Sequence, residues 1–232
     1  MPLLQREKAR YLSGQEKPGG GEHVDYKTIP SKMKMEYLHG IGDLSQRRLD
    51  GLQTLLAHLR KPKMNIDELL QEAANMISKQ FAIDNVSIGL RDHKDGLYRY
   101  RAMVGFREDA IEAHKKIAYR KEQFYADSQF VGNDISKLSR LYLAEDNLIT
   151  GDEEKAFNRP ALLSMKRRTA SESLEGDYID TKIHGFYDEL LGWIEISGTR
   201  TMQLPDSTTI RWIETVASII GAALILQKAR EG

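Results

Sequence analysis

The spacing of apolar residues changes period along the chain and so separates helices from strands. From Ile66 to Phe81 the apolar residues recur at three- and four-residue steps, which predicts an amphipathic helix. Asn65 and Glu68 form a capping pair at its start. From Val86 to Leu90 the period becomes two, which is typical of a half-buried strand. A helix followed directly by a strand is therefore expected here.

The rest of the chain predicts further strands, an irregular middle and a long closing helix. Asp95-Gly96 is a hairpin turn signal, so Leu97–Val104 is expected to return beside the first strand. Residues 105–140 are mostly helical and polar in pattern. Asp206, after a proline, is a good N-cap for a helix running to about Arg230. Further strands are expected at Leu141–Ala144, Ala161–Met165, Tyr178–Phe186 and Leu190–Ser197.

The N-terminal part of the chain has a different pattern. Residues 1–32 are rich in charge and contain a glycine run, with little apolar periodicity, so a flexible arm is expected. Residues 33–61 carry a helical pattern with leucines at seven-residue intervals, and Pro62 ends it. We therefore expect three parts: an arm over 1–32, a signalling or dimerisation helix over 33–61, and a sensor-type domain over 65–230.

The closing helix carries two apolar stripes, whereas a helix that covers one face of a sheet needs one. The second stripe needs a further partner, which is the 33–61 helix, its counterpart in a second subunit, or both. A homodimer built from these end helices is expected on this basis. Its candidate interface residues are Leu52, Leu59, Trp212, Ile219, Ala223 and Leu226.

The order of elements predicts an α+β fold. Neighbouring strands joined by hairpins imply a mainly antiparallel sheet, and the flanking helices imply one helical layer on one of its faces.

Several segments, taken in order, carry a resemblance to a known family. The final strand "LLGWIEIS" (190–197) contains a glycine before alternating apolar residues, and Leu204-Pro205-Asp206 follows it. The next helix contains Ile213-Glu214-Thr215-Val216-Ala217. Upstream stand Val104-Gly105-Phe106 and the strand-like Pro160–Met165. In order and spacing these segments resemble the GAF family of small-molecule sensory domains.

The resemblance spans Ile66 to Leu226 and implies a definite architecture. It implies about six antiparallel strands, with the terminal helices on one face and an irregular helical lid over a ligand pocket on the other. PAS domains share this general plan, but a long closing helix after a glycine-containing strand favours GAF.

The residue types and motifs that the sequence lacks argue against several kinds of chemistry. The chain has no cysteine, which excludes the thiol chemistry of reductases in the resembling family and a thioether-linked pigment. Ser197–Arg200 lacks the Asn-Lys pair that begins a signature of cyclic-nucleotide-binding members, which weakens the case for those ligands. No nucleophile or phosphate-loop motif is present, so a non-enzymatic domain is expected. No cofactor is expected either, a non-covalent haem held by His114 being the alternative considered.

The charge balance and the hydropathy of the chain limit which partners and which cellular location are expected. Basic and acidic residues number 34 each, so the basic excess of a nucleic-acid reader is missing. The strongly apolar run Val216–Leu226 is too short to span a bilayer, and no signal-peptide core opens the chain. We expect a cytoplasmic protein without nucleic-acid or membrane contacts.

Aromatic residues at the lid and the second strand suggest a pocket. Tyr98, Tyr100 and Ala102 are expected on one sheet face, with Arg99 and Arg101 on the other. The pocket candidates are Tyr98, Tyr100, Phe106, His114, Phe124, Tyr125, Phe130 and Tyr142.

Two functions remain open for this fold. One is a sensor that binds a small molecule and signals through its end helices to a protein partner. The other is a ligand-free dimerisation or partner-docking module in which the aromatic residues simply fill the core. A cavity beneath the lid favours the sensor, whereas a solid core favours the docking module.

Overall fold

The chain divides into two units, residues 1–42 and 43–232. The computed structural model describes residues 30–31, 33–35, 44–125, 130–147, 149 and 151–231. The arm predicted over 1–32 and the start of the helix predicted over 33–61 fall in the first unit and lie largely outside the described residues. The fold given below is that of the second unit.

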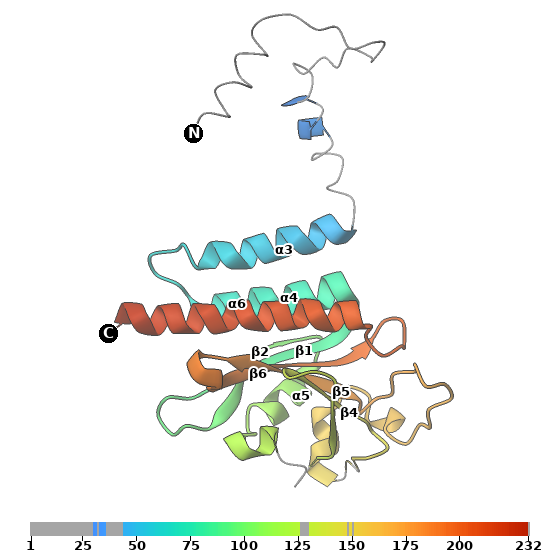
Figure 1. Ribbon diagram of the computed structural model, residues 1–232. Helices are drawn as coiled ribbons and strands as arrows, with labels where there is room; N and C mark the ends of the chain where they lie inside the picture. The colour runs from blue at the N-terminus through green and yellow to red at the C-terminus, as the bar shows by residue number, and fades with distance from the viewer. Residues whose placement is uncertain are drawn as a thin grey trace, which may run out of the picture. The chain divides into compact units, whose positions relative to one another are not determined.

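Six antiparallel strands form a single sheet in the order β2-β1-β6-β5-β4-β3 (Figure 1). The two longest strands, β1 and β6, are neighbours in the sheet, and the short β3 and β4 form one edge. The strands are β1 (Ile83–Arg91), β2 (Tyr98–Val104), β3 (Gly132–Asp134), β4 (Ser139–Tyr142), β5 (Tyr178–His184) and β6 (Leu190–Thr199).

Three long helices lie on one face of the sheet. α4 (Ile66–Phe81) and α6 (Ser207–Glu231) pack on the strands, and α3 (Leu44–His58) lies outside them against both (Figure 1). The segments that cover the opposite face include α5 (Glu108–His114) and the 3-10 turns η3 (Lys121–Phe124), η4 (Gly151–Ala156) and η5 (Pro160–Leu162). A further turn, η6 (Phe186–Asp188), joins β5 to β6. The predicted α+β architecture is confirmed.

The predicted caps and periodicities account for the helices. The Asn65 side chain accepts a hydrogen bond from the Glu68 amide at 3.3 Å, and Ala82 ends α4 in the left-handed region with φ 54°. Asp206 accepts from the Thr209 amide at 2.7 Å at the start of α6. Between helices and sheet, aliphatic side chains such as Ile77 and Ile194 are fully buried. Each such side chain stabilises the fold by about 1.5–3 kcal/mol through removal from water.

Two strand predictions differ from the structure. The strand predicted over Ala161–Met165 is wrong: Pro160–Leu162 is a 3-10 turn, because proline lacks an N–H for the ladder and has the φ of a helical turn. The sixth strand is instead Gly132–Asp134, whose three residues have no apolar alternation to reveal it.

A bulge in β2 changes which way its residues face. Ile88 pairs with Ala102 and Gly89 pairs with Tyr100, so Arg101 is the extra residue. Ala102 therefore joins the core beneath the helices, while Tyr100 lies on the opposite face. The expectation that Tyr98, Tyr100 and Ala102 share one face is wrong for Ala102, because the bulge reverses the alternation.

The second stripe of α6 is covered within the same chain. Ile219 and Ala223 are buried in the core that α3, α4 and α6 share, which corrects the expectation that they face a second copy. The covering partner is α3, one of the alternatives that the pattern left open. The remaining interface candidates, which are partly buried, are Leu52, Leu59, Trp212 and Leu226.

α6 is longer than its strongly apolar run suggests. Within the described part of the chain, Ser207–Arg230 is the one helix that is long and apolar enough to cross a membrane by length and composition. Half of its most apolar window is buried in the fold, which is what the core helix of a packed domain shows.

Candidate functional site

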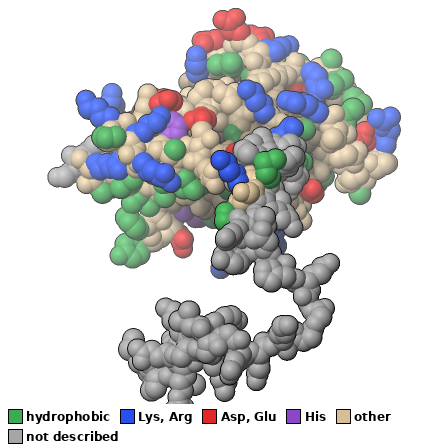
Figure 2. All heavy atoms as spheres, turned by 90° about the horizontal axis from the view of Figure 1, so that it is seen from above, with side chains coloured by type: hydrophobic (Ala, Val, Ile, Leu, Met, Phe, Trp, Pro, Cys, Tyr) green, Lys and Arg blue, Asp and Glu red, His purple; other side chains and the backbone are tan. Residues whose placement is uncertain are grey.

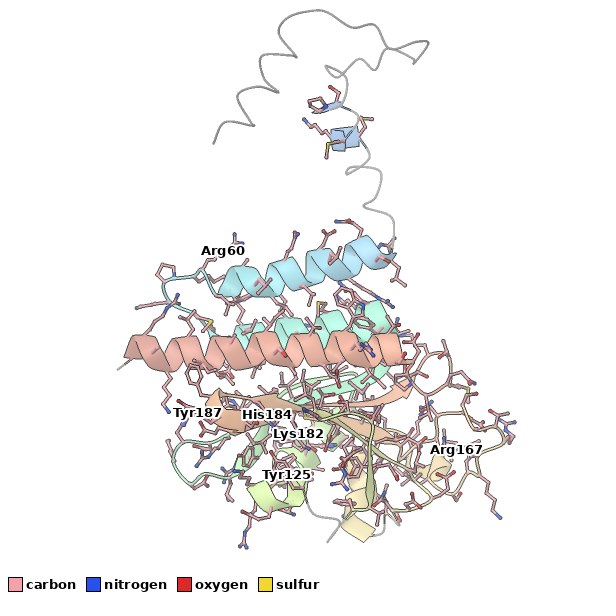
Figure 3. The ribbon with its side chains drawn as sticks, viewed as in Figure 1. Arg60, Tyr125, Arg167, Lys182, His184 and Tyr187 are labelled. Carbon is pink, nitrogen blue, oxygen red and sulfur yellow. The ribbon has the colours of Figure 1, made fainter. Side chains whose placement is uncertain are left out.

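A cavity of about 240 Å³ lies on the sheet face opposite the long helices. Side chains of the central strands form its floor. The segments that we call the lid, which are the described parts of residues 105–131 and 143–177, form its walls. Figure 3 shows these side chains crowded beneath the sheet, on the side away from α3, α4 and α6. The sheet therefore has an aliphatic core on one face and a lined cavity on the other.

A row of polar residues crosses the floor. Ser87, Glu195, Asp180 and Arg140 are successive register partners on β1, β6, β5 and β4. The Glu195 carboxylate accepts hydrogen bonds from Ser87 Oγ at 3.4 Å and from the Tyr100 hydroxyl at 3.0 Å. Asp180 is 9% exposed, lines the cavity, and its Oδ1 has no hydrogen-bond partner among the described groups. A buried carboxylate oxygen without a partner is rare and calls for an explanation.

Burial and negative charge dominate the electrostatics of the floor. Burial, together with the neighbouring Glu195 carboxylate, raises the pKa of Asp180 well above its usual range. Burial and the same two acids raise the pKa of Tyr178, and burial with Glu195 raises that of Tyr100. Both phenols thus stay protonated at neutral pH, and that of Tyr100 donates a hydrogen bond to Glu195. The floor is consequently a poorly hydrated place in which a second negative charge is unfavourable.

Aromatic rings hold the floor and walls together around Trp193, which is 1% exposed. The Trp193 ring lies 5.0 Å from Tyr100, 5.6 Å from Tyr119 and 5.1 Å from Phe124, measured between ring centroids. The first two contacts are edge-to-face, the arrangement that aromatic quadrupoles favour. The indole passes over Gly89, where any Cβ atom would collide with it. Glycine at this position is what lets the tryptophan lie flat on the strand.

Two further carboxylates at the cavity have basic partners. Arg159 Nε lies 3.0 Å from Glu175 Oε2, and Arg167 Nη2 lies 2.8 Å from Asp177 Oδ1. Asp177 also accepts from a backbone amide of the lid, that of Leu174, at 2.8 Å. In these ion pairs the arginines compensate the negative charge of Glu175 and Asp177 and hold the lid segments together. Asp180 and Glu195, by contrast, have no ion-pair partner among the described residues.

The structure brings six of the eight predicted pocket residues together at the cavity. These six are Tyr100, Phe106, His114, Phe124, Phe130 and Tyr142. Tyr98 is buried beside the cavity, where its hydroxyl donates to the Leu190 carbonyl at 2.8 Å. Tyr125 is 47% exposed, and Lys182 Nζ lies 4.6 Å from its ring centroid (Figure 3). Tyr98 and Tyr125 are thus outside the cavity lining, and the ligand-binding role of the other six stays a prediction.

His114 serves as part of the cavity wall. Its Nδ1 lies 2.8 Å from the Ala110 carbonyl within α5, and its ring packs edge-to-face on Tyr100 at 4.9 Å. The intrahelical hydrogen bond and the ring contact both hold the imidazole against the lid rather than free above the floor.

The floor residues are what sequence reasoning missed. Tyr178 and Asp180 alternate on β5 with isoleucines, and Trp193 and Glu195 do so on β6. The isoleucines face the helices, so the alternate set faces the lid. This period-two pattern of polar and aromatic residues on two adjacent strands is the signal that points to the floor.

One of three comparisons with known proteins, that with solved structures, finds similar folds. No protein-family model matches the sequence, and no curated protein matches it. Among solved structures, the GAF domain of A. aeolicus nlh2 in an inactive state aligns with TM-score 0.50 at 13% identity, over 80% of this chain and 99% of that one. The GAF domain of a Coxiella burnetii phosphoenolpyruvate-protein phosphotransferase aligns with TM-score 0.49 at 15% identity, over 80% and 96%. The GAF domain of a putative sensor histidine kinase from Pseudomonas syringae pv. tomato aligns with TM-score 0.46 at 9% identity, over 88% of this chain and 96% of that one.

The chain therefore has the GAF fold, as its sequence predicted. At these identities the likeness establishes the fold alone, and the chemistry of the cavity has to be argued from the residues that line it.

Proposed function

We propose that residues 65–230 are a non-catalytic sensory domain that binds a small molecule beneath the lid and signals through its terminal helices. The observation that carries the proposal is the cavity between lid and sheet, lined by aromatic side chains and by the unpartnered Asp180 carboxylate. A space filled by its own side chains, as the docking module requires, would leave no such cavity. Convergent polar groups in an otherwise apolar cavity are the usual features of a ligand site.

The size of the cavity bounds the ligand. A dry cavity of roughly 150 Å³ holds benzene. The cavity of about 240 Å³ therefore suits a molecule somewhat larger than one aromatic ring. We do not include haem in the proposal, because a porphyrin is far larger than this space.

Strand β4 provides a route from the cavity to the helices. Tyr142 lines the cavity, whereas Ser139, on the other face of the same strand, donates to Glu214 Oε1 of α6 at 2.8 Å. Ser136, in the β3–β4 turn, bonds the same oxygen at 2.5 Å. A ligand that shifts β4 would change these hydrogen bonds to Glu214. Binding in the cavity would in this way alter how α6 is held on the sheet.

We also propose that the domain works as a homodimer through α3, with a signalling protein as its downstream partner. Three leucines on α3 support the dimer, since Leu44, Leu49 and Leu56 are 40–49% exposed. On the face seen in Figure 2, basic side chains are dispersed among acidic and apolar ones rather than gathered in a patch, which gives no support to a nucleic-acid partner.

Ligand-observed NMR with a fragment library tests the binding proposal. Ala156, which is 9% exposed and lines the cavity, is replaced by phenylalanine to fill the space. The matched control is Ala229→Phe, at an exposed position near the end of α6. We expect aromatic fragments to bind the wild type and the control but not Ala156→Phe. Fragments that bind all three proteins equally, or none, would contradict the proposal and favour the ligand-free docking module.

A further inference from the structure

We propose that the cavity selects a ligand with a cationic nitrogen group, such as an amidinium, guanidinium or ammonium, carried on a flat ring system. The proposal rests on the proposed function, because it assumes that the cavity is the ligand site. It assigns the nitrogen group to the carboxylates of Asp180 and Glu195, and the ring to the aromatic walls.

The two carboxylates lie side by side, and no ion pair to either of them is found among the described residues. Asp180 and Glu195 are direct register partners on the antiparallel strands β5 and β6, so their side chains stand next to each other on the cavity face. The Tyr100 and Ser87 hydroxyls already donate to Glu195. Asp180 is more than nine-tenths buried, and its Oδ1 has no hydrogen-bond partner among the residues that the structure describes. A cationic N–H group above this pair satisfies that oxygen and offsets the unfavourable ionisation of Asp180 beside Glu195.

The basic side chains closest to this pair are engaged elsewhere. Arg140, the register partner of Asp180 on β4, donates from Nη2 to the Gly132 carbonyl at 2.8 Å, and its Nε is 3.6 Å from Asp134. Lys182 lies two residues along β5 and places its Nζ over the Tyr125 ring, outside the cavity lining. Within the described part of the chain, neither basic side chain forms an ion pair with Asp180 or Glu195, although the positive charge of both favours the ionised form of Asp180.

The lining as a whole disfavours anions. No lysine or arginine is found among the described residues that line the cavity. The other acids there, Glu175 and Asp177, are held by Arg159 and Arg167 in the lid. A phosphate or carboxylate group would meet the Asp180–Glu195 pair with no positive partner. A cation meets a favourable charge at the floor.

The aromatic side chains of the floor and the lid suit the rest of such a ligand. The faces and edges of Trp193, Tyr100 and Tyr119 surround the floor within ring-centroid distances of 5.0–6.0 Å of one another. Aromatic faces of tryptophan and tyrosine attract cations and stack on planar groups. Carboxylates at the base with aromatic rings around them are therefore complementary to a planar cationic ligand.

Three probes that share one ring and differ in charge test the proposal: benzamidine, benzamide and benzoate. Their affinities for the full chain are measured by ligand-observed NMR or calorimetry. We expect benzamidine to bind at least tenfold more tightly than benzamide, and benzoate to bind more weakly still. In Asp180→Asn, which keeps the shape of the side chain, the preference for benzamidine is expected to disappear while benzamide affinity is unchanged. Glu195→Gln is the second variant and is expected to reduce the same preference.

The outcomes separate this proposal from the one on which it rests. If benzamide binds as tightly as benzamidine, or if both variants keep the preference, the cavity binds ligands but the charge selectivity is overturned. If none of the three probes binds the wild type, and the fragment comparison with Ala156→Phe also shows no difference, ligand binding in the cavity fails and the selectivity with it.

Discussion

Glu214 on α6 accepts a 2.8 Å hydrogen bond from the Ser139 hydroxyl on β4, across the interface between the helical layer and the sheet. Ser139 is also 3.0 Å from Thr181 Oγ1 on β5, so the contact is part of a small buried network. Further along β4, Tyr142 lines the cavity, and the Arg140 guanidinium lies 5.8 Å from its ring centroid. Strand β4 therefore contacts α6, the helix proposed to transmit the signal, through one face. Its other face contacts the proposed ligand cavity.

Replacing Glu214 by alanine tests this link. The change leaves two serine hydroxyls without their acceptor, and hydrogen bonds to a charged group contribute about 1.5–3 kcal/mol each at most. We expect the free energy of unfolding to fall by about 1–3 kcal/mol in urea denaturation. Thr215→Ala is the control, since Thr215 is exposed and bonds the Arg211 carbonyl within α6. Equal stability in the two variants would show that the contact does not anchor α6.

Asp180→Asn is expected to change stability in a pH-dependent way. The pKa of Asp180 is raised in the folded protein by burial and by Glu195, with Lys182 and Arg140 opposing the rise. As pH rises above 3.8, the unfolded chain releases this proton while the folded chain retains it, so stability falls with pH. Asparagine has no proton to lose. The variant should therefore be more stable than the wild type at pH 8, with the difference shrinking toward pH 4.

Thermal unfolding at a series of pH values measures this difference. A wild type that is as stable as Asp180→Asn at pH 8, or more stable, would mean that the buried carboxylate is compensated by a group in the fold. That result would remove the reason for assigning a cationic partner to it.

Asp206→Ala tests the cap of α6 and has the opposite pH dependence. The backbone hydrogen bond from Thr209 lowers the pKa of Asp206 below 3.8, so its contribution is present above that value and is lost as pH falls through the folded pKa. At pH 7 the loss of an N-cap costs about 0.5–2 kcal/mol. Asp206→Asn retains an acceptor and should stay close to the wild type at pH 7. A cost for alanine that is unchanged at pH 2 would rule out the ionised cap as its source.

Two charged substitutions on the helical layer are expected to differ in their effect on stability, because one position is buried and the other is exposed. Ile219 is 9% exposed within the core, so Ile219→Asp buries an unpaired charge and should unfold the domain or cost about 4 kcal/mol or more. Leu56 on α3 is 40% exposed, so Leu56→Asp should remain folded, with a change of about 1 kcal/mol or less.

Light scattering at micromolar concentration measures the oligomeric state of a double variant, Leu49→Asp with Leu56→Asp. We expect a folded monomer where the wild type is a dimer. A double variant that keeps the mass of the wild-type dimer would place the interface away from these leucines.

Local periodicity sufficed for much of the fold. The period of 3.6 at Ile66–Phe81 and the period of two at β1 and β6 correspond to elements seen in the structure, and the Asn65 and Asp206 caps form as their residue types predict. Two of the failures were non-local. The bulge at Arg101 depends on how β2 pairs with β1, and the three-residue β3 forms because β4 lies beside it.

The same limit applies to the site. Aromatic residues of the lid are recognisable from their position, but the carboxylates of the floor are not. Asp180 and Glu195 meet because β5 and β6 pair in one register, and their facing direction depends on which side of the sheet the helices cover. Whether the space above them is filled is decided by the packing of many lid side chains together, which no short sequence pattern specifies.

Native mass spectrometry tests the central claim, that the cavity holds a small molecule, most directly. The purified wild-type chain, Ala156→Phe and Ala229→Phe are each incubated with a cellular small-molecule extract and transferred to the gas phase under gentle conditions. We predict that the wild type and Ala229→Phe retain a small molecule of constant mass and that Ala156→Phe does not. A wild type that emerges with its bare chain mass, or an adduct that the filled cavity retains equally, would contradict the account.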